Sequence, residues 1–209
     1  MLFAKAPVKG LVKTRLVPAI PAEFALDLHR AFVKDMISRF RYLEATDFEL
    51  HTNMTTDEWA DIGVAHKLQI PGDLGLKMIH ALDAALQSGY RRALVLGGDA
   101  PTLPVGHVRT LLASERDVAL GPAQDGGFYA ISAGRVCHRM FDGVPWSQSD
   151  TMARTMEAID RSGLSVELGP PWFDVDEPGD LRRLLADNDL PANTAACLKR
   201  FSEVKINTG

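Results

Sequence analysis

The feature that most constrains the fold is an alternation of strand-like and helical patterns along most of the 209 residues. Short apolar stretches typical of strands occur at 2–4, 47–53, the start of 66–75, 91–97, 117–122, 127–133 and 165–169. Helical patterns fall between them, at 21–40, 75–88, 105–113, 151–162 and 178–187. This alternation predicts an α/β fold in which helices cover both faces of a mostly parallel sheet.

The stretch 21–40 shows the helical pattern most clearly. Its large apolar residues, Phe24, Leu28, Phe32, Met36 and Phe40, are four positions apart and therefore share one helix face. Residues 188–209 are only weakly patterned, and no element is assigned there. The length fits one domain, so we expect 1–209 to form a single domain with a weakly patterned tail.

Composition narrows the class of protein. The net charge of −4 argues against a protein that coats nucleic acid, so an anion site would have to be local. Cys137 and Cys197 are too few for a zinc spacing or a disulfide framework, which favours plain thiols. No stretch is apolar for the roughly 18 residues of a membrane span, and Lys5 comes too early for a signal peptide. We therefore expect a cytoplasmic protein.

Polar loops directly follow several of the expected strands. They are 5–15, 71–75, Gly97-Gly98-Asp99 and Gln124-Asp125-Gly126-Gly127. In open α/β sheets, ligands bind beyond the carboxyl ends of the strands. The coincidence of these loops predicts a binding site at that edge of the sheet.

The loop 5–15 is rich in cations. Gly10 allows a close backbone approach, and Lys13 and Arg15 offer charge-assisted hydrogen bonds to phosphate oxygens. The spacing matches neither a Walker A loop nor a dinucleotide fingerprint. A solvated cationic surface loop is the alternative, and the residue types alone leave both interpretations open.

Acidic residues follow two further stretches. Asp99 comes right after an apolar strand and is either a hard oxygen ligand for Mg²⁺ or Mn²⁺ or a turn or capping residue. Asp174 and Asp176 would point to the same face of an extended segment, while Asp176 or Glu177 could equally cap the next helix.

Asp125 also has two interpretations. Asp-Gly is a strong hairpin signal, so Asp125 either makes a turn or binds and deprotonates a hydroxyl group. The histidines have no convincing metal-ligand spacing, and structural roles are favoured for all of them. Trp146 and Trp172 either pack in the core or line a pocket.

Six stretches, taken in order, resemble a known family. They are "FAKAPVKGLVKTRL", "QIPGDLGLKM", "LVLGGDAPTLP", "ALGPAQDGGFYAI", "GVPWS" and "FDVDEPGDL", and they span residues 2 to about 185. The chain resembles bacterial glycosyltransferase-like proteins of the radical-SAM- or selenodomain-associated transferase type, within the nucleotide-diphospho-sugar transferase superfamily. The resemblance implies a glycosyltransferase A-type fold, a Rossmann-like three-layer α/β/α sandwich with a mixed sheet. Leu76, Lys77, Phe128 and Gln148 depart from the usual family pattern.

The resemblance also implies roles for individual residues. Asp99 and Asp176 would bind Mg²⁺ or Mn²⁺, Asp125, Lys13 and Arg15 would be catalytic, and Asp125, Gly126, Gly127 and Trp146 would bind the substrate. The nucleotide would be held by Ala4, Lys5, Pro7, Gly10, Lys13, Thr14, Arg15, Gln69, Gly72, Asp73 and Gly98.

These roles lead to a functional hypothesis. The chain would be a metal-dependent transferase that moves a sugar from a nucleotide-diphospho-sugar to a small-molecule acceptor that the sequence does not identify. One alternative is a guanylyltransferase-like nucleotidyltransferase, which would use a nucleoside triphosphate and release pyrophosphate. Another is a non-catalytic nucleotide-binding protein of the same fold. Neither nucleic acid nor a membrane is an expected partner.

Overall fold

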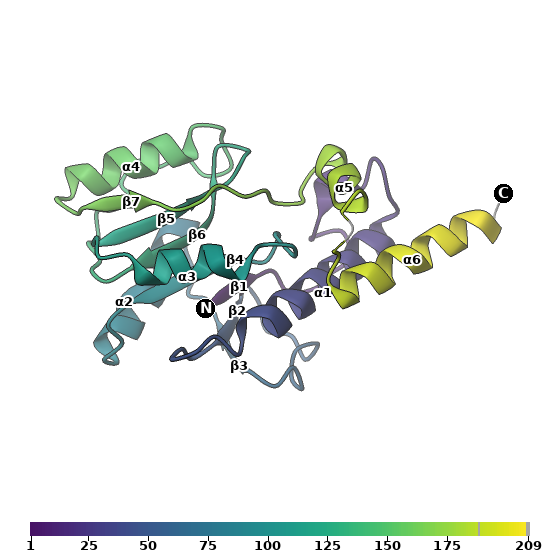
Figure 1. The fold of residues 1–209 in the computed structure, drawn as a ribbon, viewed down its shortest axis with the longest axis horizontal. Coiled ribbons are helices and arrows are strands. Elements are labelled where there is room, and N and C mark those ends of the chain that lie inside the picture. Colours follow the sequence, from purple (N-terminus) through teal and green to yellow (C-terminus); the bar gives the residue numbers. More distant parts are fainter. Residues whose placement is uncertain (188, 208–209) are drawn as a thin grey trace. The chain divides into compact units, whose positions relative to one another are not determined.

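The computed structural model describes residues 1–187 and 189–207 (Figure 1). In chain order the elements are β1 (Leu2–Ala4), η1 (Thr14–Leu16, a 3₁₀ turn), α1 (Ala22–Phe40), β2 (Glu49–Thr52), β3 (Ala65–Leu68), α2 (Leu74–Gln87), β4 (Ala93–Gly97), α3 (Val105–Ala113), β5 (Val118–Pro122), β6 (Phe128–Ala133), α4 (Thr151–Arg161), β7 (Val166–Leu168), α5 (Pro178–Leu185) and α6 (Ala192–Asn207). Every strand and helix expected from the sequence is present, within a few residues of its expected bounds.

Within the described residues, seven strands form a mixed sheet in the order β3-β2-β1-β4-β6-β5-β7. The β1–β2 and β5–β7 pairs are parallel, whereas β6 runs antiparallel to both β4 and β5. The loop 123–127 joins β5 to β6 as a hairpin, which confirms the turn interpretation of the Asp-Gly pair. The expected α/β fold with a mixed sheet is confirmed.

The chain divides into two compact units that are interleaved in sequence. Unit 1 contains Met1, Leu68–Gly97 and Leu103–Asp174, and unit 2 contains Leu2–Lys67, Gly98–Thr102 and Val175–Gly209. The single-domain organisation expected from the length stays a prediction.

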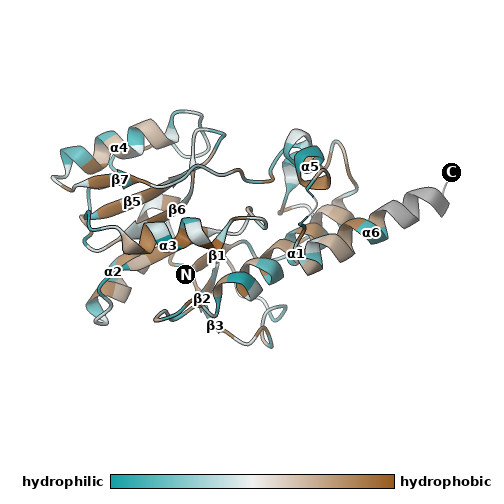
Figure 2. Ribbon diagram, viewed as in Figure 1, coloured by the Kyte–Doolittle hydropathy of each residue, from teal (hydrophilic) through white to brown (hydrophobic). Residues whose placement is uncertain are grey.

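Unit 1 has its core on the strands β4, β5 and β6. Successive residues of these strands are buried without alternation, for example Val118–Gly121 in β5. Because neighbouring side chains in a strand point to opposite faces, both faces of these strands must be covered. The helices α2, α3 and α4 pack on strands of this unit, and β5 and β7 stand out as hydrophobic in Figure 2.

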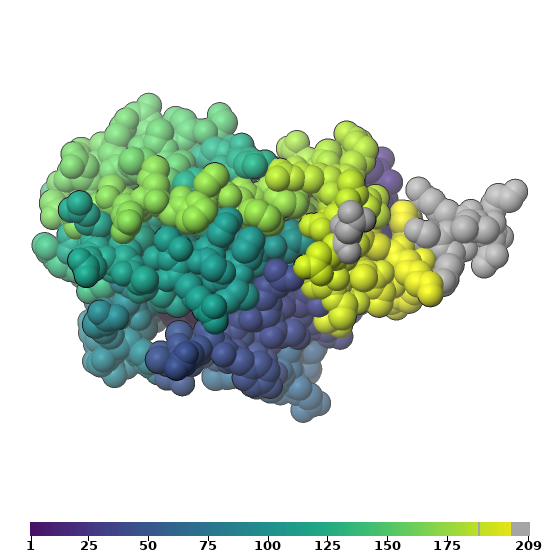
Figure 3. Space-filling view, in the orientation of Figure 1, coloured from purple at the N-terminus to yellow at the C-terminus, as the bar shows by residue number. Residues whose placement is uncertain are grey.

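Unit 2 has its core along α1. The residues predicted to share one face are all buried: Phe24, Leu28, Phe32, Met36 and Phe40. Burying each such side chain contributes about 1.5–3 kcal/mol. The helix α6 packs along α1, as Figure 3 shows by the contact of the yellow and blue atoms. The β1–β2 pair completes this unit, with Leu2 opposite Leu50 and Ala4 opposite Thr52.

The helix α6 is an element that the weak pattern of the tail did not reveal. Asp35 of α1 accepts hydrogen bonds from the backbone N–H groups of Asn193 and Thr194 at 3.0 and 2.7 Å, which satisfies free donors at the start of α6. The Phe24 and Phe201 rings stack with centroids 3.9 Å apart. The helix is therefore specified largely by partners on α1 that are distant in sequence. Residues 188, 208 and 209 of this tail lie outside the described residues.

Among the described residues, no helix combines the length and the apolar character needed to cross a membrane.

Candidate functional site

The cationic loop after β1 is held in place by its backbone. The N–H of Ala6 donates to Asn53 Oδ1 at 2.7 Å, and Nε2 of the buried His29 donates to the Lys5 carbonyl at 2.9 Å. Burial lowers the pKa of His29, so the ring is neutral at pH 7. Gly10 has a φ of +78°, the left-handed conformation that glycine adopts most readily. These contacts fix the path of the loop toward Lys13.

Lys13 lies at the centre of a charged cluster in unit 2. Its Nζ forms ion pairs with Asp99 Oδ1 and, at 3.0 Å, with Asp176 Oδ1. The same Nζ donates to the Val175 carbonyl at 2.7 Å and lies 5.1 Å from the centroid of the Phe32 ring. The Lys13 side chain is only 2% exposed, compared with 42% for Asp99 and 37% for Asp176. We call Lys13, Asp99 and Asp176 the charge cluster.

The cluster shifts the pKa of each member. Burial lowers the pKa of Lys13, but the two negative charges outweigh burial and raise it above 10.5. Burial raises the pKa of Asp99, but the positive charge of Lys13 outweighs it and lowers that pKa below 3.8. For Asp176, burial and the charge of Asp99 together outweigh Lys13 and raise the pKa. Lys13 and Asp99 are therefore the firmly ionised pair, and Asp176 is the easier carboxylate to protonate.

Local backbone geometry brings the two carboxylates to the same amine. The N–H of Val175 donates to the Asp99 carbonyl at 2.9 Å, which ties the segment before α5 to the turn after β4. A side chain at Gly98 would lie 3.3 Å from the Phe3 carbonyl, so glycine permits this close approach to β1. The sequence left capping of α5 open between two residues, and the structure assigns it to Glu177 in a capping box with Asp180. The Asp176 side chain is thereby left for the charge cluster.

The charge cluster can be compared with the two ligands expected at this site, a phosphate group and a divalent metal ion. A lysine ammonium has three donors, and Asp99, Asp176 and Val175 accept from Lys13, so this conformation leaves no Lys13 donor for a phosphate oxygen. Among the described residues, no group of three or more His, Cys, Asp or Glu side chains is placed to hold a metal ion. Two carboxylates suffice for Mg²⁺, which keeps several waters and binds substrate phosphates. Asp99 and Asp176, which already share the ammonium group of Lys13, fit such an ion.

The other cations of the loop are more exposed. The Arg15 side chain is 55% exposed and lies 4.0 Å from Glu177, and Lys9 pairs with Glu23 at 2.5 Å. Lys5 donates to the Leu11 carbonyl at 3.4 Å. Of these residues, Arg15 is the cation best placed beside the charge cluster to meet an anion, because Glu177 is the next residue after Asp176.

The predicted loop 71–75 belongs to unit 1. Asp73 caps α2 by accepting from the N–H of Leu76 at 2.8 Å. A side chain at Gly75 would lie 2.8 Å from Trp146, so the start of α2 packs against the indole ring. Gln69, which follows β3, and Gly72 flank this capped turn.

The predicted loop 125–127 also belongs to unit 1 and contacts the start of α4. Asp125 Oδ1 accepts from the N–H of Gly127 at 2.9 Å, and the Gly126 carbonyl accepts from the N–H of Met152 at 2.8 Å. A side chain at Gly126, whose φ is +89°, would lie 1.9 Å from the Ser149 carbonyl oxygen. Only glycine fits this contact without moving the backbone.

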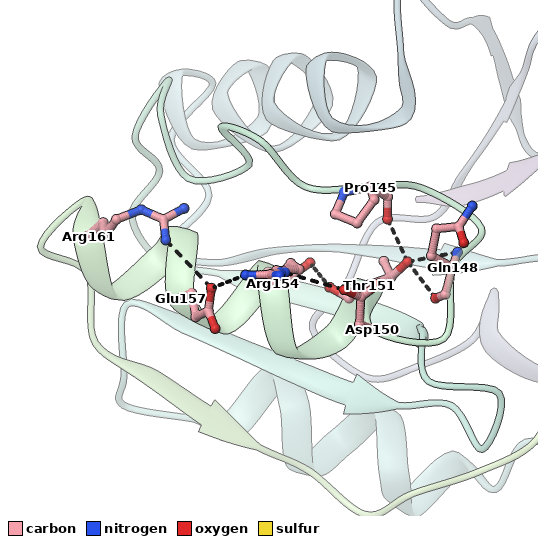
Figure 4. A network of polar contacts seen from close by, with 8 residues as sticks. Pro145, Gln148, Asp150, Thr151, Arg154, Glu157 and Arg161 are labelled. Atoms are coloured by element: carbon pink, nitrogen blue, oxygen red, sulfur yellow. Dashed lines mark hydrogen bonds and ion pairs between the residues drawn. The ribbon is translucent and has the colours of Figure 1, made fainter.

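Trp146 and α4 support this loop. The Trp146 ring packs edge-on against Phe141 and Phe128, with centroids 5.5 and 6.4 Å away. Thr151 Oγ1 lies within hydrogen-bond distance of the Pro145 and Gln148 carbonyl oxygens, at 2.6 and 2.8 Å, as Figure 4 shows. In the same figure, Arg154 and Glu157 link Asp150 to Arg161 along the exposed side of α4.

The structure therefore sorts the predicted site residues into two groups. In unit 2, Lys13, Asp99 and Asp176 make direct contact, and Pro7, Gly10 and Thr14 are on the loop that carries Lys13. A side chain added at Gly98 would lie 3.5 Å from Ala4 Cβ. In unit 1, Trp146 contacts the turn after Asp73, and the loop 125–127 contacts the start of α4. The individual ligand-binding and catalytic roles stay predictions.

Sequence reasoning missed several supporting groups of the charge cluster. The Val175 carbonyl and the Phe32 ring contact Lys13, and Asn53 and His29 hold the loop. Asn53 is the last residue of the expected strand 47–53 and could have been noticed for that reason. A backbone carbonyl or a core phenylalanine carries no signal of such a role in the sequence.

Comparison with known proteins adds relatives of this chain. A family described as "Uncharacterized protein conserved in bacteria (DUF2064)" matches residues 40–148, just over half of the chain. A crystal structure from Desulfovibrio desulfuricans G20, described as a "putative nucleotide-diphospho-sugar transferase", is 31% identical in sequence. The match covers 97% of this chain and 94% of that chain, with a TM-score of 0.85. No curated protein matches the chain.

More distant structures share the fold. A cytidylyltransferase from Leptospira borgpetersenii serovar Hardjo-bovis is 12% identical, with a TM-score of 0.56 and coverage of 99% of this chain and 93% of that chain. The CMP:2-keto-3-deoxy-manno-octonic acid synthetase in complex with CTP is 11% identical, with a TM-score of 0.54 and coverage of 89% and 96%. At these identities the likeness concerns the fold alone.

Together, the α/β fold, the family match and the 31% identical relative agree with the superfamily that the six stretches resemble, while the narrower transferase type stays a prediction. The chain belongs to the bacterial family described as DUF2064 and shares the fold of nucleotide-diphospho-sugar transferase-like and cytidylyltransferase structures.

Proposed function

We propose that the protein is a metal-dependent transferase that moves a sugar from a nucleotide-diphospho-sugar to a small-molecule acceptor. The observation that carries the proposal is the charge cluster, where two carboxylates and a buried lysine meet beside Arg15. Support also comes from the relative described as a "putative nucleotide-diphospho-sugar transferase", which is 31% identical over nearly the whole chain.

The chain's own residues have distinct tasks in this proposal. Asp99 and Asp176 would hold Mg²⁺ or Mn²⁺, and a bound cation supplies neutralisation of charge on the phosphates of the leaving nucleotide. Arg15, which is exposed and can bind two oxygens at once, holds the same phosphates. Lys5, Pro7, Gly10 and Thr14 belong to the loop that positions Arg15.

The acceptor is assigned to the residues of unit 1. Asp125 is exposed at the tip of the hairpin and orients or deprotonates the acceptor hydroxyl. Gly126 and Gly127 allow the backbone of this loop to approach the acceptor closely. Trp146 is half-buried, and its indole ring would pack against the sugar. In unit 2, Ala4 and Gly98 are assigned to the base and ribose, and the nucleotide-binding roles of Gln69, Gly72 and Asp73 in unit 1 stay predictions.

Thermal unfolding with a panel of nucleotides, nucleoside triphosphates and nucleotide sugars, with and without Mn²⁺, tests the proposal. A donor at 100 times its dissociation constant stabilises the folded state by about 2.7 kcal/mol. The shift should require Mn²⁺ and disappear in Asp99→Asn. It should persist in Asp61→Asn, which removes the same charge from an exposed position in unit 2.

The released product then identifies the reaction. Sugar transfer releases a nucleoside diphosphate, whereas pyrophosphate would identify the nucleotidyl transfer considered as the alternative. A donor that binds without metal and is never turned over would contradict the proposal and leave a non-catalytic nucleotide-binding protein.

A further inference from the structure

We propose that Lys13 occupies the place between Asp99 and Asp176 that a divalent cation takes, so that the lysine and the cation exclude one another. This inference rests on the proposed function, because it concerns the same two carboxylates. In this inference Lys13 competes with the metal for the carboxylates. The competition sets the affinity for the metal and links metal binding to binding of the nucleotide donor.

The atoms involved argue for direct competition. One oxygen of each carboxylate, Asp99 Oδ1 and Asp176 Oδ1, already pairs with the same Nζ atom. Hard divalent cations choose the same carboxylate oxygens. A cation that bridges the two side chains would place at least a double positive charge beside the ammonium of Lys13, and this repulsion is strong where a 2% exposed group has little water around it.

The charge balance explains why a cation could replace the lysine. Two carboxylates and one ammonium leave a net charge of −1 in the cluster. A divalent cation compensates both carboxylates. The lysine has a flexible stem, so the ammonium can leave while the backbone of the loop stays fixed by Asn53 and His29.

Release of Lys13 couples the metal to an anionic donor. Once Asp99 and Asp176 bind the cation, the N–H groups of Lys13 that were bonded to these carboxylates need new hydrogen-bond acceptors. Donor phosphates beside Arg15 supply them. The metal should therefore bind weakly alone and more tightly with the donor, and the same factor should apply in the reverse direction.

Mn²⁺ affinity without any nucleotide provides the first test. Electron paramagnetic resonance of free Mn²⁺ would be measured with the wild type, Lys13→Met and Lys9→Met. Removing the competitor should tighten Mn²⁺ binding roughly tenfold or more in Lys13→Met. Lys9→Met is the matched control, because it removes one charge from the same loop. Lys9 pairs with Glu23 and not with the charge cluster. Its Mn²⁺ affinity should stay within about twofold of the wild type.

Acetylation of the wild type provides a second test that does not depend on how well a variant folds. Mass spectrometry would follow the modification of Lys13 and of Lys9, whose side chain is 61% exposed. Lys13 should react slowly without metal and several-fold faster with saturating Mn²⁺, while Lys9 reacts equally in both conditions.

The outcomes separate this inference from the proposed function. If Mn²⁺ binds the wild type and Lys13→Met equally, or binds while Lys13 stays protected, the competition is refuted and the metal site remains. Weaker Mn²⁺ binding by Lys13→Met would also refute the competition, because Lys13 would then support the metal. If neither protein binds Mn²⁺ with or without a donor, both the inference and the metal site fail.

Discussion

The two groups of predicted site residues are held together by different forces. In unit 2 the charge cluster is an arrangement of opposite charges around a nearly inaccessible ammonium. In unit 1 the loop 125–127 and Trp146 are fixed by shape, through glycines that approach a carbonyl and an indole ring. A charged arrangement responds to pH, metal and phosphate, whereas a steric arrangement responds to added atoms. Substitutions that distinguish charge from volume should therefore separate the two groups.

The largest expected effect is steric. Gly126→Ala places a methyl group 1.9 Å from the Ser149 carbonyl oxygen and should lower the free energy of unfolding by about 3 kcal/mol, because the backbone has to move. Gly10→Ala is the matched control, since Gly10 also has a positive φ but has no atom within 4 Å of the added carbon. The control should cost about 1 kcal/mol. Equal losses in urea unfolding would show that conformation, and not the close contact, limits both positions.

Tyr129, a buried ionisable group in unit 1, is neutral at pH 7 whereas Lys13 is charged, although the pKa of both groups is raised. Burial, together with the charge of Asp174, raises the pKa of Tyr129 to about 12, so Tyr129 stays neutral where Lys13 stays charged. In the unfolded chain Tyr129 ionises near pH 10, so above this pH the unfolded state becomes favoured. The free energy of unfolding should therefore fall by roughly 2 to 3 kcal/mol as the pH rises from 10 to 12.

Urea unfolding of the wild type and Tyr129→Phe between pH 9 and 12 measures this loss. The phenylalanine variant should lack that part of the pH dependence, because its side chain does not ionise. An identical pH dependence in both proteins would contradict the assignment of a raised pKa to Tyr129.

The charge cluster predicts unequal effects for its two carboxylates. Asp99 has a lowered pKa, so its ionised form stabilises the fold above its ordinary pKa of 3.8, and this contribution is lost as the pH falls through the lower folded value. Asp99→Asn should cost about 1–2 kcal/mol at pH 7, less than for a fully buried pair because the side chain is 42% exposed. Asp176→Asn should cost about 0.5 kcal/mol or less, since burial disfavours the charge of Asp176.

Unfolding at pH 7 and near pH 3 compares these two variants. The difference between the wild type and Asp99→Asn should shrink at the lower pH. A larger loss in Asp176→Asn at neutral pH would reverse the proposed order of the two carboxylates.

A similarly small effect is expected at the cap of α2. Asp73→Ala removes one hydrogen bond at the exposed start of the helix and should lower the free energy of unfolding by about 1 kcal/mol. Asp73→Asn keeps an acceptor and should restore most of the loss. If Asp73→Ala were as damaging as Gly126→Ala, the loop 71–75 would be held by more than its cap.

Much of the fold follows from local patterns in the sequence. The spacing from Phe24 to Phe40 predicted α1, and the strand-like stretch 117–122 and the Asp-Gly pair predicted the hairpin from β5 to β6. Each of these signals lies within a few residues, where periodicity and turn chemistry decide the structure. The helix α6 was missed because its stabilising partners, Asp35 and Phe24, are more than 150 residues away.

The sequence by itself indicated which residues are candidates for the chemistry, because cations, carboxylates and glycines that follow strands can be read from it directly. Only the tertiary structure decided their pairing. Lys13 was expected to face phosphate and Asp99 and Asp176 to face metal, yet in the fold they face each other. Contacts over more than 80 residues depend on how β1, the turn after β4 and the segment before α5 converge, and no local pattern encodes that geometry.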